Sequence, residues 1–178
     1  MKSLRNRIQW GLAALLLAAP ALMQASAPSV PPTIDQRVHH ELLMLPYYNV
    51  FDNLQYEVSG DTVTLLGQVT NPVLKSDAGN AVKRIPGVTT VANRIEVLPL
   101  SPMDWQIRRA ELRAIYAYGA LSRYGMGAVP SIHIIVRGGH VTLDGVVSSE
   151  MDRNLAGIRA NGVSNVFSVT NNLVVSKA

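Results

Sequence analysis

Alternating apolar and polar residues predict a β-hairpin in the first half of the chain. The alternation runs through residues 54–58 and 62–69, where nearly every second side chain is apolar. Gly60 lies in the three-residue connection, and glycine readily adopts the positive φ of tight hairpin turns. A third segment of strand-like composition covers residues 91–97. We therefore expect two paired strands and, after an intervening segment, a third strand.

The intervening segment has the period of a helix. Asn71 and Pro72 favour a helix start, because asparagine caps the first turn and proline fits into it. Pro86 and Gly87 favour its end. The apolar residues between these signals follow helical spacing: Leu74, Ala78, Ala81 and Ile85. A helix is therefore predicted between the second and third strands.

The same pattern occurs twice. Shifting the sequence by 78 positions without a gap aligns many pairs of identical residues, among them Val58/Val136, Gly60/Gly138, Val63/Val141, Thr64/Thr142, Leu65/Leu143, Gly67/Gly145, Val69/Val147, Ala78/Ala156, Val88/Val166, Val91/Val169, Asn93/Asn171 and Val97/Val175. Such a register indicates an internal duplication. We expect two domains, at residues 33–98 and 104–178, joined by a linker at residues 99–103 that contains two prolines.

Several positions in the repeat are expected to serve turns, helix ends or close packing. Gly67 and Gly145 fall on the apolar side of their strands, where a missing side chain lets another element approach, and a crossing helix is the expected neighbour. Ser149 and Asp152 resemble a capping box at the start of the second copy's helix. Structural roles are therefore predicted for Gly60, Gly67, Gly87, Gly138, Gly145 and Asn165.

These motifs resemble the BON domain, present twice. The first copy reads VSGDTVTLLGQV and VTTVANRIEV, and the second reads VRGGHVTLDGVV and VFSVTNNLVV. The resemblance implies an α+β fold with two small α/β sandwiches, each ordered helix, strand, strand, helix, strand, with two helices on one face of a three-stranded mixed sheet. It also implies a non-enzymatic role at the envelope of Gram-negative bacteria, through phospholipid or protein contact. The pattern is similar to the osmotically inducible periplasmic type, which is linked to osmotic stress and envelope integrity.

The first residues have the pattern of a secretory signal peptide. Lys2, Arg5 and Arg7 precede an apolar run at residues 8–19. That run is too short for a membrane span, which needs roughly 20 helical residues, so a permanent anchor is the weaker alternative. We expect residues 1–27 to be removed, residues 28–32 to form a proline-rich linker, and the mature chain to reside in the periplasm without a transmembrane segment.

Charge and composition narrow the possible functions. Without its predicted leader the chain has 13 basic and 12 acidic residues, which lacks the excess of positive charge that nucleic-acid binding requires. The chain has no cysteine, so a disulfide scaffold, a thiol nucleophile and a lipidated cysteine anchor are all excluded. The charge is uneven, because residues 28–101 have a net charge of −2 and residues 102–178 a net charge of +3.

The helix predicted at residues 105–121 has two distinct sides. Its expected core side contains Ile107, Ala110, Ala114, Ala117, Tyr118 and Leu121. Its opposite side combines aromatic and apolar residues with arginines, and we predict it as the lipid-binding site: Trp105, Arg108, Arg109, Leu112, Arg113 and Tyr116. A face of this composition suits reversible, peripheral binding to anionic phospholipid. Two alternatives are that this face packs on the first domain or binds a protein.

An enzyme is the weakest hypothesis. His39, His40, His133 and His140 lack the spacing of a metal pair and are expected to be solvated at the surface. We predict no catalytic residues, no metal and no cofactor. The main competing function is a soluble periplasmic chaperone or adaptor that binds envelope proteins. It would add a partner strand to an open sheet edge, such as a strand at residues 51–58.

Overall fold

The computed structural model describes residues 31–176, and the first half of this range is built on one hairpin. Strands β1 (Asn53–Ser59) and β2 (Thr62–Val69) pair in antiparallel register, with Val58 opposite Val63. Strands β3 (Thr90–Asn93) and β4 (Glu96–Val97) run parallel to β2. The third strand of the predicted sheet is therefore present in two pieces, and the sheet is mixed.

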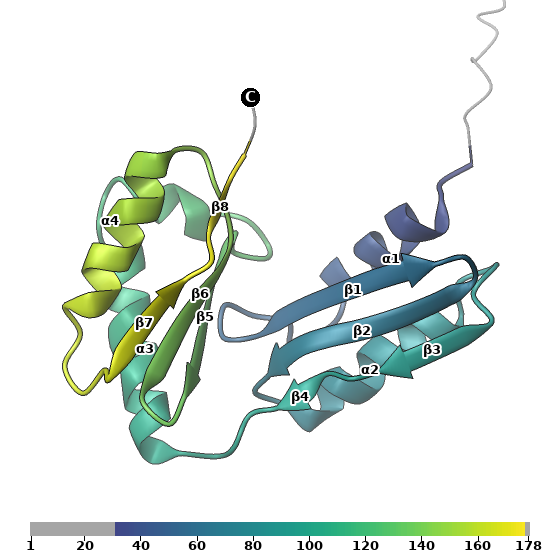
Figure 1. Cartoon of the computed structure of the whole chain (residues 1–178), viewed down its shortest axis with the longest axis horizontal. Helices are drawn as coiled ribbons and strands as arrows, with labels where there is room; N and C mark the ends of the chain where they lie inside the picture. Colours follow the sequence, from purple (N-terminus) through teal and green to yellow (C-terminus); the bar gives the residue numbers. More distant parts are fainter. Residues whose placement is uncertain (1–30, 177–178) are drawn as a thin grey trace, which may run out of the picture. The chain divides into compact units, whose positions relative to one another are not determined.

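Two capped helices complete the first half. Helix α1 (Ile34–Leu43) begins with a capping box between Thr33 and Gln36. Helix α2 (Pro72–Lys83) begins at Asn71, whose side chain accepts a hydrogen bond from the Val73 N–H. Both helices cover the same face of the sheet (Figure 1).

The second half repeats this order with one addition. Its hairpin and last strand follow the order of the first half. The second strand of the hairpin buries the equivalent residues, whereas the first strand is buried along nearly its whole length, unlike β1. The elements are α3 (Pro102–Tyr116), the short 3₁₀ helix η1 (Ser122–Gly125), β5 (Ile132–Arg137), β6 (His140–Val147), α4 (Glu150–Asn161), β7 (Ser168–Asn171) and β8 (Val174–Val175). The predicted α+β class, with two tandem α/β units, is confirmed.

The repeated asparagines explain why the last strand of each half is broken. The Asn93 side chain accepts the Ile95 N–H and donates to the Lys75 carbonyl oxygen in α2, at 2.7 Å. Asn171 makes the same two contacts in the second half, with Leu173 and Arg153. Each asparagine therefore links the break in its strand to the neighbouring helix, which accounts for its identity in both copies.

The expected helix crossing at Gly67 and Gly145 is wrong. A Cβ at Gly67 would lie 2.0 Å from the carbonyl oxygen of Asn53, and one at Gly145 would lie 2.0 Å from that of Ser131. Both glycines also have positive φ, 102° and 126°. The close neighbour is therefore the backbone at the start of the paired strand, and each hairpin needs glycine at this point for both reasons.

Each half has its own apolar core, and the second core includes two residues from the first half. The first core contains Val38, Leu42, Val63, Leu65, Val69, Leu74, Ala78, Val82, Ile85 and Ile95. Val50 and Phe51, which precede β1, belong instead to the second core, together with Ile107, Ile115, Ile132, Ile134 and Leu143. From Pro32 onward the chain forms one compact unit.

The predicted signal peptide, residues 1–27, lies outside the described residues. Within residues 31–176, no helix has the length and the hydropathy that crossing a membrane requires.

Candidate functional site

Helix α3 is fixed at its N-terminus by a buried carboxylate. The Ser101 side chain accepts the Asp104 N–H and caps the helix. The Asp104 carboxylate accepts hydrogen bonds from the N–H groups of Gly138 and Gly139, at 2.9 and 2.8 Å. The first turn of α3 is thereby tied to the turn between β5 and β6, which sets the direction of the helix over the sheet.

The buried side of α3 differs from the side that the apolar pattern predicted. Its buried residues are Asp104, Ile107, Arg108, Glu111 and Ile115. Ala117 and Tyr118, expected in the core, are exposed. At 100° per residue, the observed core side is rotated by about a quarter turn from the predicted one. Three of the buried residues are charged. A helical projection that counts only apolar residues therefore misplaces the centre of the buried side.

Arg108 does not belong to the exposed face on which it was predicted. Its side chain is 4% exposed, and its Nη2 donates a hydrogen bond of 2.6 Å to the carbonyl oxygen of Val136 in β5. Burial lowers the pKa of Arg108, while the carboxylates of Asp104 and Asp52 act in the opposite direction. Arg108 therefore stabilises the contact between α3, β5 and the segment before β1, and it cannot reach a lipid headgroup in this structure.

The position of Trp105 agrees in part with the alternative that this face of α3 packs on the first domain. Its ring contacts Phe51 in an edge-on arrangement, with centroids 5.5 Å apart. Nevertheless the side chain remains 48% exposed. One side of Trp105 therefore packs on a residue from the first half, and the other side faces solvent.

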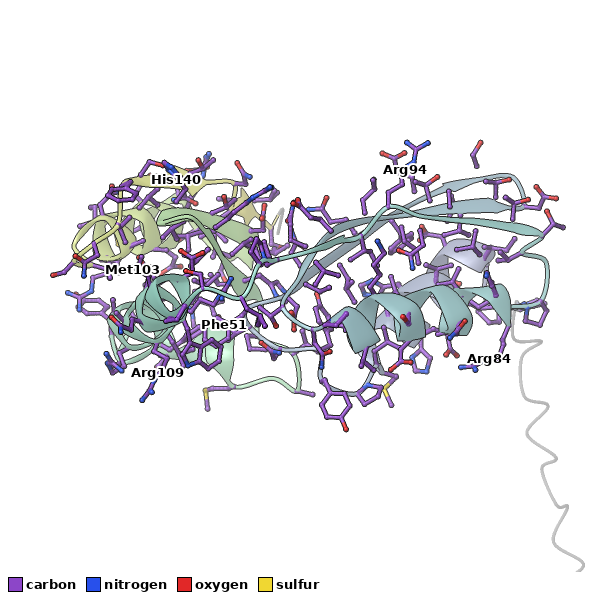
Figure 2. All side chains as sticks on the ribbon, turned by 90° about the horizontal axis from the view of Figure 1, so that it is seen from below. Phe51, Arg84, Arg94, Met103, Arg109 and His140 are labelled. Carbon is purple, nitrogen blue, oxygen red and sulfur yellow. The ribbon has the colours of Figure 1, made fainter. Side chains whose placement is uncertain are left out.

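Arg109 and Arg113 are the two exposed cations of α3. Figure 2 shows Arg109 extending from the helix into solvent. Neither arginine forms an ion pair with an acidic side chain in the part of the chain that the structure describes. By contrast, Arg123, Arg137 and Arg153 are each paired with a carboxylate. Since residues three and four apart lie side by side on a helix, the two arginines also flank Leu112 and Tyr116.

Leu112 and Tyr116 form the floor of an open groove. Both are half-buried, and the Tyr116 hydroxyl donates to the carbonyl oxygen of Ile132. Burial raises the pKa of Tyr116, so it remains a neutral donor. The groove has a volume of about 600 Å³, and its lining is mostly apolar: Tyr48, Asn49, Val50, Leu112, Tyr116, Ser122, Gly125, Met126, Gly127, Ala128 and Pro130.

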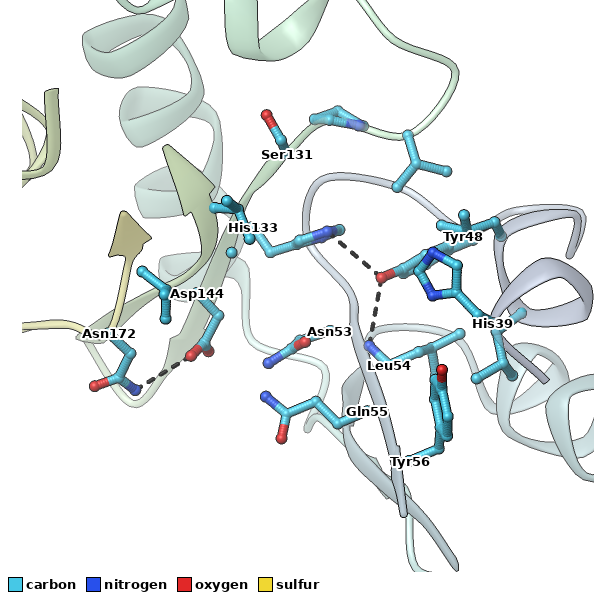
Figure 3. A pocket seen from close by; sticks show the side chains of 17 residues that line it. His39, Tyr48, Asn53, Leu54, Gln55, Tyr56, Ser131, His133, Asp144 and Asn172 are labelled. Atoms are coloured by element: carbon cyan, nitrogen blue, oxygen red, sulfur yellow. Dashed lines mark hydrogen bonds between the residues drawn. The ribbon is translucent and has the colours of Figure 1, made fainter. Parts of the chain in front are cut away.

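His133 is buried, which corrects the expectation that all four histidines are solvated. Its ring stacks on Tyr48 with centroids 5.4 Å apart, and its Nε2 lies 3.4 Å from the Tyr48 hydroxyl (Figure 3). Burial is the main reason why its pKa lies below the usual value, although nearby Asp52 and Asp144 oppose this effect. The arrangement is a packed aromatic pair beside a pocket of about 480 Å³. Sequence spacing gave no signal for it.

The strand on which the adaptor hypothesis relied begins later than predicted. Strand β1 starts at Asn53, and Phe51 is buried in the second core. The Val50 carbonyl oxygen accepts the Ile134 N–H of β5 at 2.8 Å. The segment before β1 is therefore already occupied by contacts within the chain.

Comparison with known proteins identifies the two halves by family. A family model described as the BON domain matches residues 32–99 and 118–177. No curated protein matches the chain. The whole of α3 lies between the two matched segments, so its exposed face is a feature of this chain that the family model does not cover.

Two solved structures show a distant likeness. Both are CdsD, a structural protein of the type III secretion system of Chlamydia trachomatis, and one is its C-terminal domain. The C-terminal domain is 11% identical, covers 79% of this chain and 96% of its own, and has a TM-score of 0.33. The other is 12% identical, covers 82% and 93%, and has a TM-score of 0.32. At these scores the likeness carries no argument about function.

Proposed function

The chain belongs to the BON-domain family, and from this premise we propose that it binds the surface of anionic phospholipid membranes through the α3 face of its second domain. Members of this family are generally non-catalytic envelope proteins associated with membranes or phospholipids. The observation that carries the finer proposal is the pair of exposed, unpaired arginines, Arg109 and Arg113, beside an apolar groove. A periplasmic location and a role in envelope integrity or stress tolerance complete the proposal.

The chemistry of the face predicts weak and reversible binding. Each arginine near an anionic surface contributes about 1 kcal/mol, and this contribution falls with distance over a Debye length of about 8 Å at physiological salt. Trp105, half-exposed on the same side of α3, suits the interface between headgroups and acyl chains. Binding is therefore expected to rise with anionic lipid content and to fall with salt.

Replacing Arg109 and Arg113 with alanine is expected to weaken binding to anionic vesicles about thirtyfold at low salt. Loss of two headgroup contacts of about 1 kcal/mol each gives this factor. The measurement is co-sedimentation of residues 28–178 with phosphatidylcholine vesicles that contain graded amounts of phosphatidylglycerol. Because both side chains are exposed and unpaired, the fold should remain intact, which circular dichroism checks.

The matched control removes two positive charges from the surface of the first half. Arg84 and Arg94 are exposed arginines of the first half, labelled in Figure 2, and their replacement with alanine should change binding less than threefold. Equal losses in the two double variants would show that net charge, and not the α3 face, governs binding. Absence of binding at every lipid composition would reject the membrane proposal and favour a protein partner.

A further inference from the structure

Tyr47 is presented to solvent by a strained backbone. It has φ of 69°, and only one other non-glycine residue in the described range has positive φ. This conformation is unfavourable for a bulky side chain, and such strain persists only where surrounding contacts impose it. The Tyr47 side chain is 70% exposed. The backbone is therefore strained at a residue whose ring makes little contact with the rest of the protein.

The contacts that impose this conformation come from Asn49 and Asp52. The Asn49 side chain donates to the carbonyl oxygen of Tyr47 and accepts the Phe51 N–H, both at 2.9 Å. The fully buried Asp52 accepts the N–H groups of Asn49 and Thr70. With Phe51 packed in the second core, the segment is held at several points. Tyr47 therefore projects from a fixed loop.

Met126 is a second exposed apolar side chain, and it lines the groove directly. Its side chain is 83% exposed, between Gly125 and Gly127. The segment that carries it is anchored on one side by Leu121, which is fully buried. It is also anchored by Tyr124, whose hydroxyl donates to Asp152 and whose carbonyl oxygen accepts the Ser131 N–H. The connection between helix and first strand is longer here than in the first half, and the added length includes this exposed methionine.

We propose that Tyr47 and Met126 form an apolar lip that enters the acyl region of the bilayer when Arg109 and Arg113 engage the headgroups. Met126 lines the groove itself, and Tyr47 directly precedes Tyr48, which lines the wall contributed by the first half. The occupant is a phospholipid surface because unpaired cations and exposed apolar side chains border one mostly apolar groove. This inference rests on the proposed function. It extends that function by giving the first domain a part in lipid binding.

The absence of cysteine from the chain allows a site-specific test. Four single-cysteine variants of residues 28–178 are labelled with an environment-sensitive fluorophore: Tyr47→Cys, Met126→Cys, Met151→Cys and Phe167→Cys. Met151 and Phe167 are controls of similar exposure, 79% and 78%, outside the groove. Vesicles of phosphatidylcholine and phosphatidylglycerol carry spin-labelled acyl chains as quenchers. We expect quenching at positions 47 and 126 and little at 151 and 167.

Binding without quenching at positions 47 and 126 would overturn the lip while leaving the proposed function intact. Quenching at position 126 alone would overturn the part assigned to the first domain. No binding of the unlabelled chain would reject both proposals.

A second measurement uses vesicle binding of double serine variants. Replacing Tyr47 and Met126 with serine should weaken binding about tenfold, whereas replacing Met151 and Phe167 with serine should not. Equal effects would also overturn the lip.

Discussion

Glu111→Val is expected to stabilise the second domain by about 3 kcal/mol at pH 8. Glu111 is fully buried in the core side of α3, and both of its carboxyl oxygens lack a hydrogen-bond partner. An ionised carboxylate in such surroundings is strongly disfavoured, so burial raises the pKa of Glu111 to about 8. In the folded domain Glu111 is therefore mostly protonated at neutral pH.

A helix of the first half also buries a residue in its core, and that residue is valine. Helices α1 and α3 end at Leu43 and Tyr116, and the fifth residue before each end is Val38 and Glu111 respectively. Both side chains are fully buried. Valine has nearly the volume of glutamate without its charge, so Glu111→Val should fill the same space in the core with an apolar side chain.

The sign of the pH dependence follows from the direction of the pKa change. Below the ordinary glutamate pKa of 4.5, Glu111 is protonated in both folded and unfolded chains, and stability is unaffected. As the pH rises from 4.5 to about 8, only the unfolded chain releases the proton, so stability falls by up to about 1.4 kcal/mol per pH unit. The lowered pKa of buried His133 acts in the opposite sense, but only below its ordinary value of 6.5. The interval from pH 6.5 to 8 therefore isolates Glu111.

Urea unfolding of residues 28–178 between pH 5 and 8 measures this slope. In Glu111→Val the decline between pH 6.5 and 8 should disappear. Glu111→Gln is the matched control, because it removes the titration but keeps polar atoms in the core, and it should flatten the slope with a smaller gain in stability. The reciprocal change, Val38→Glu, should destabilise the first domain increasingly as the pH rises. A slope that persists in Glu111→Val would show that another group causes it.

The sequence predicted the elements that local signals define. Asn71 and Ser149 cap their helices, and the repeat places equivalent residues in both sheets. The hairpins turn at the predicted glycines, although each turn has two residues and not three, because Ser59 pairs with Thr62 and Arg137 with His140. The break in each last strand was not predicted, because it depends on contacts of Asn93 and Asn171 with helices about 18 residues earlier. The spacing of apolar residues along the sequence gives no information on such contacts.

The candidate site was predictable only in part, because α3 buries charged residues. A projection that counts apolar side chains places Arg108 on the exposed face, whereas Arg108 is buried and donates to the Val136 carbonyl oxygen. The same projection gave no indication that Glu111 lies in the core. The exposure of Arg109, Arg113 and one side of Trp105 agrees with the projection. Their role in lipid binding stays a prediction. The insertion of Phe51 into the second core is a long-range contact that no sequence period indicates.

Phe51→Ala is expected to destabilise the second domain by about 3 kcal/mol, although Phe51 precedes the first strand of the first domain. Its ring is buried among second-core residues and contacts Trp105, so truncation leaves a cavity there. The adjacent Val50 carbonyl caps the edge of β5 through the Ile134 N–H. Loss of the Phe51 anchor should therefore also weaken the hydrogen bonding of β5.

Hydrogen exchange locates the effect of this substitution. In Phe51→Ala the amides of β5 and α3 should lose protection more than those of β2 and α2, because the missing ring belongs to the second core. Ile95→Ala is the matched control: Ile95 is 1% exposed in the first core, and its truncation should show the reverse distribution. If Phe51→Ala mainly exposed the amides of the first domain, or cost less than about 1 kcal/mol, the segment before β1 would not be part of the second core in solution. If the expected distribution is found, the second domain is complete only with a segment of the first, and the lipid face of α3 depends on both.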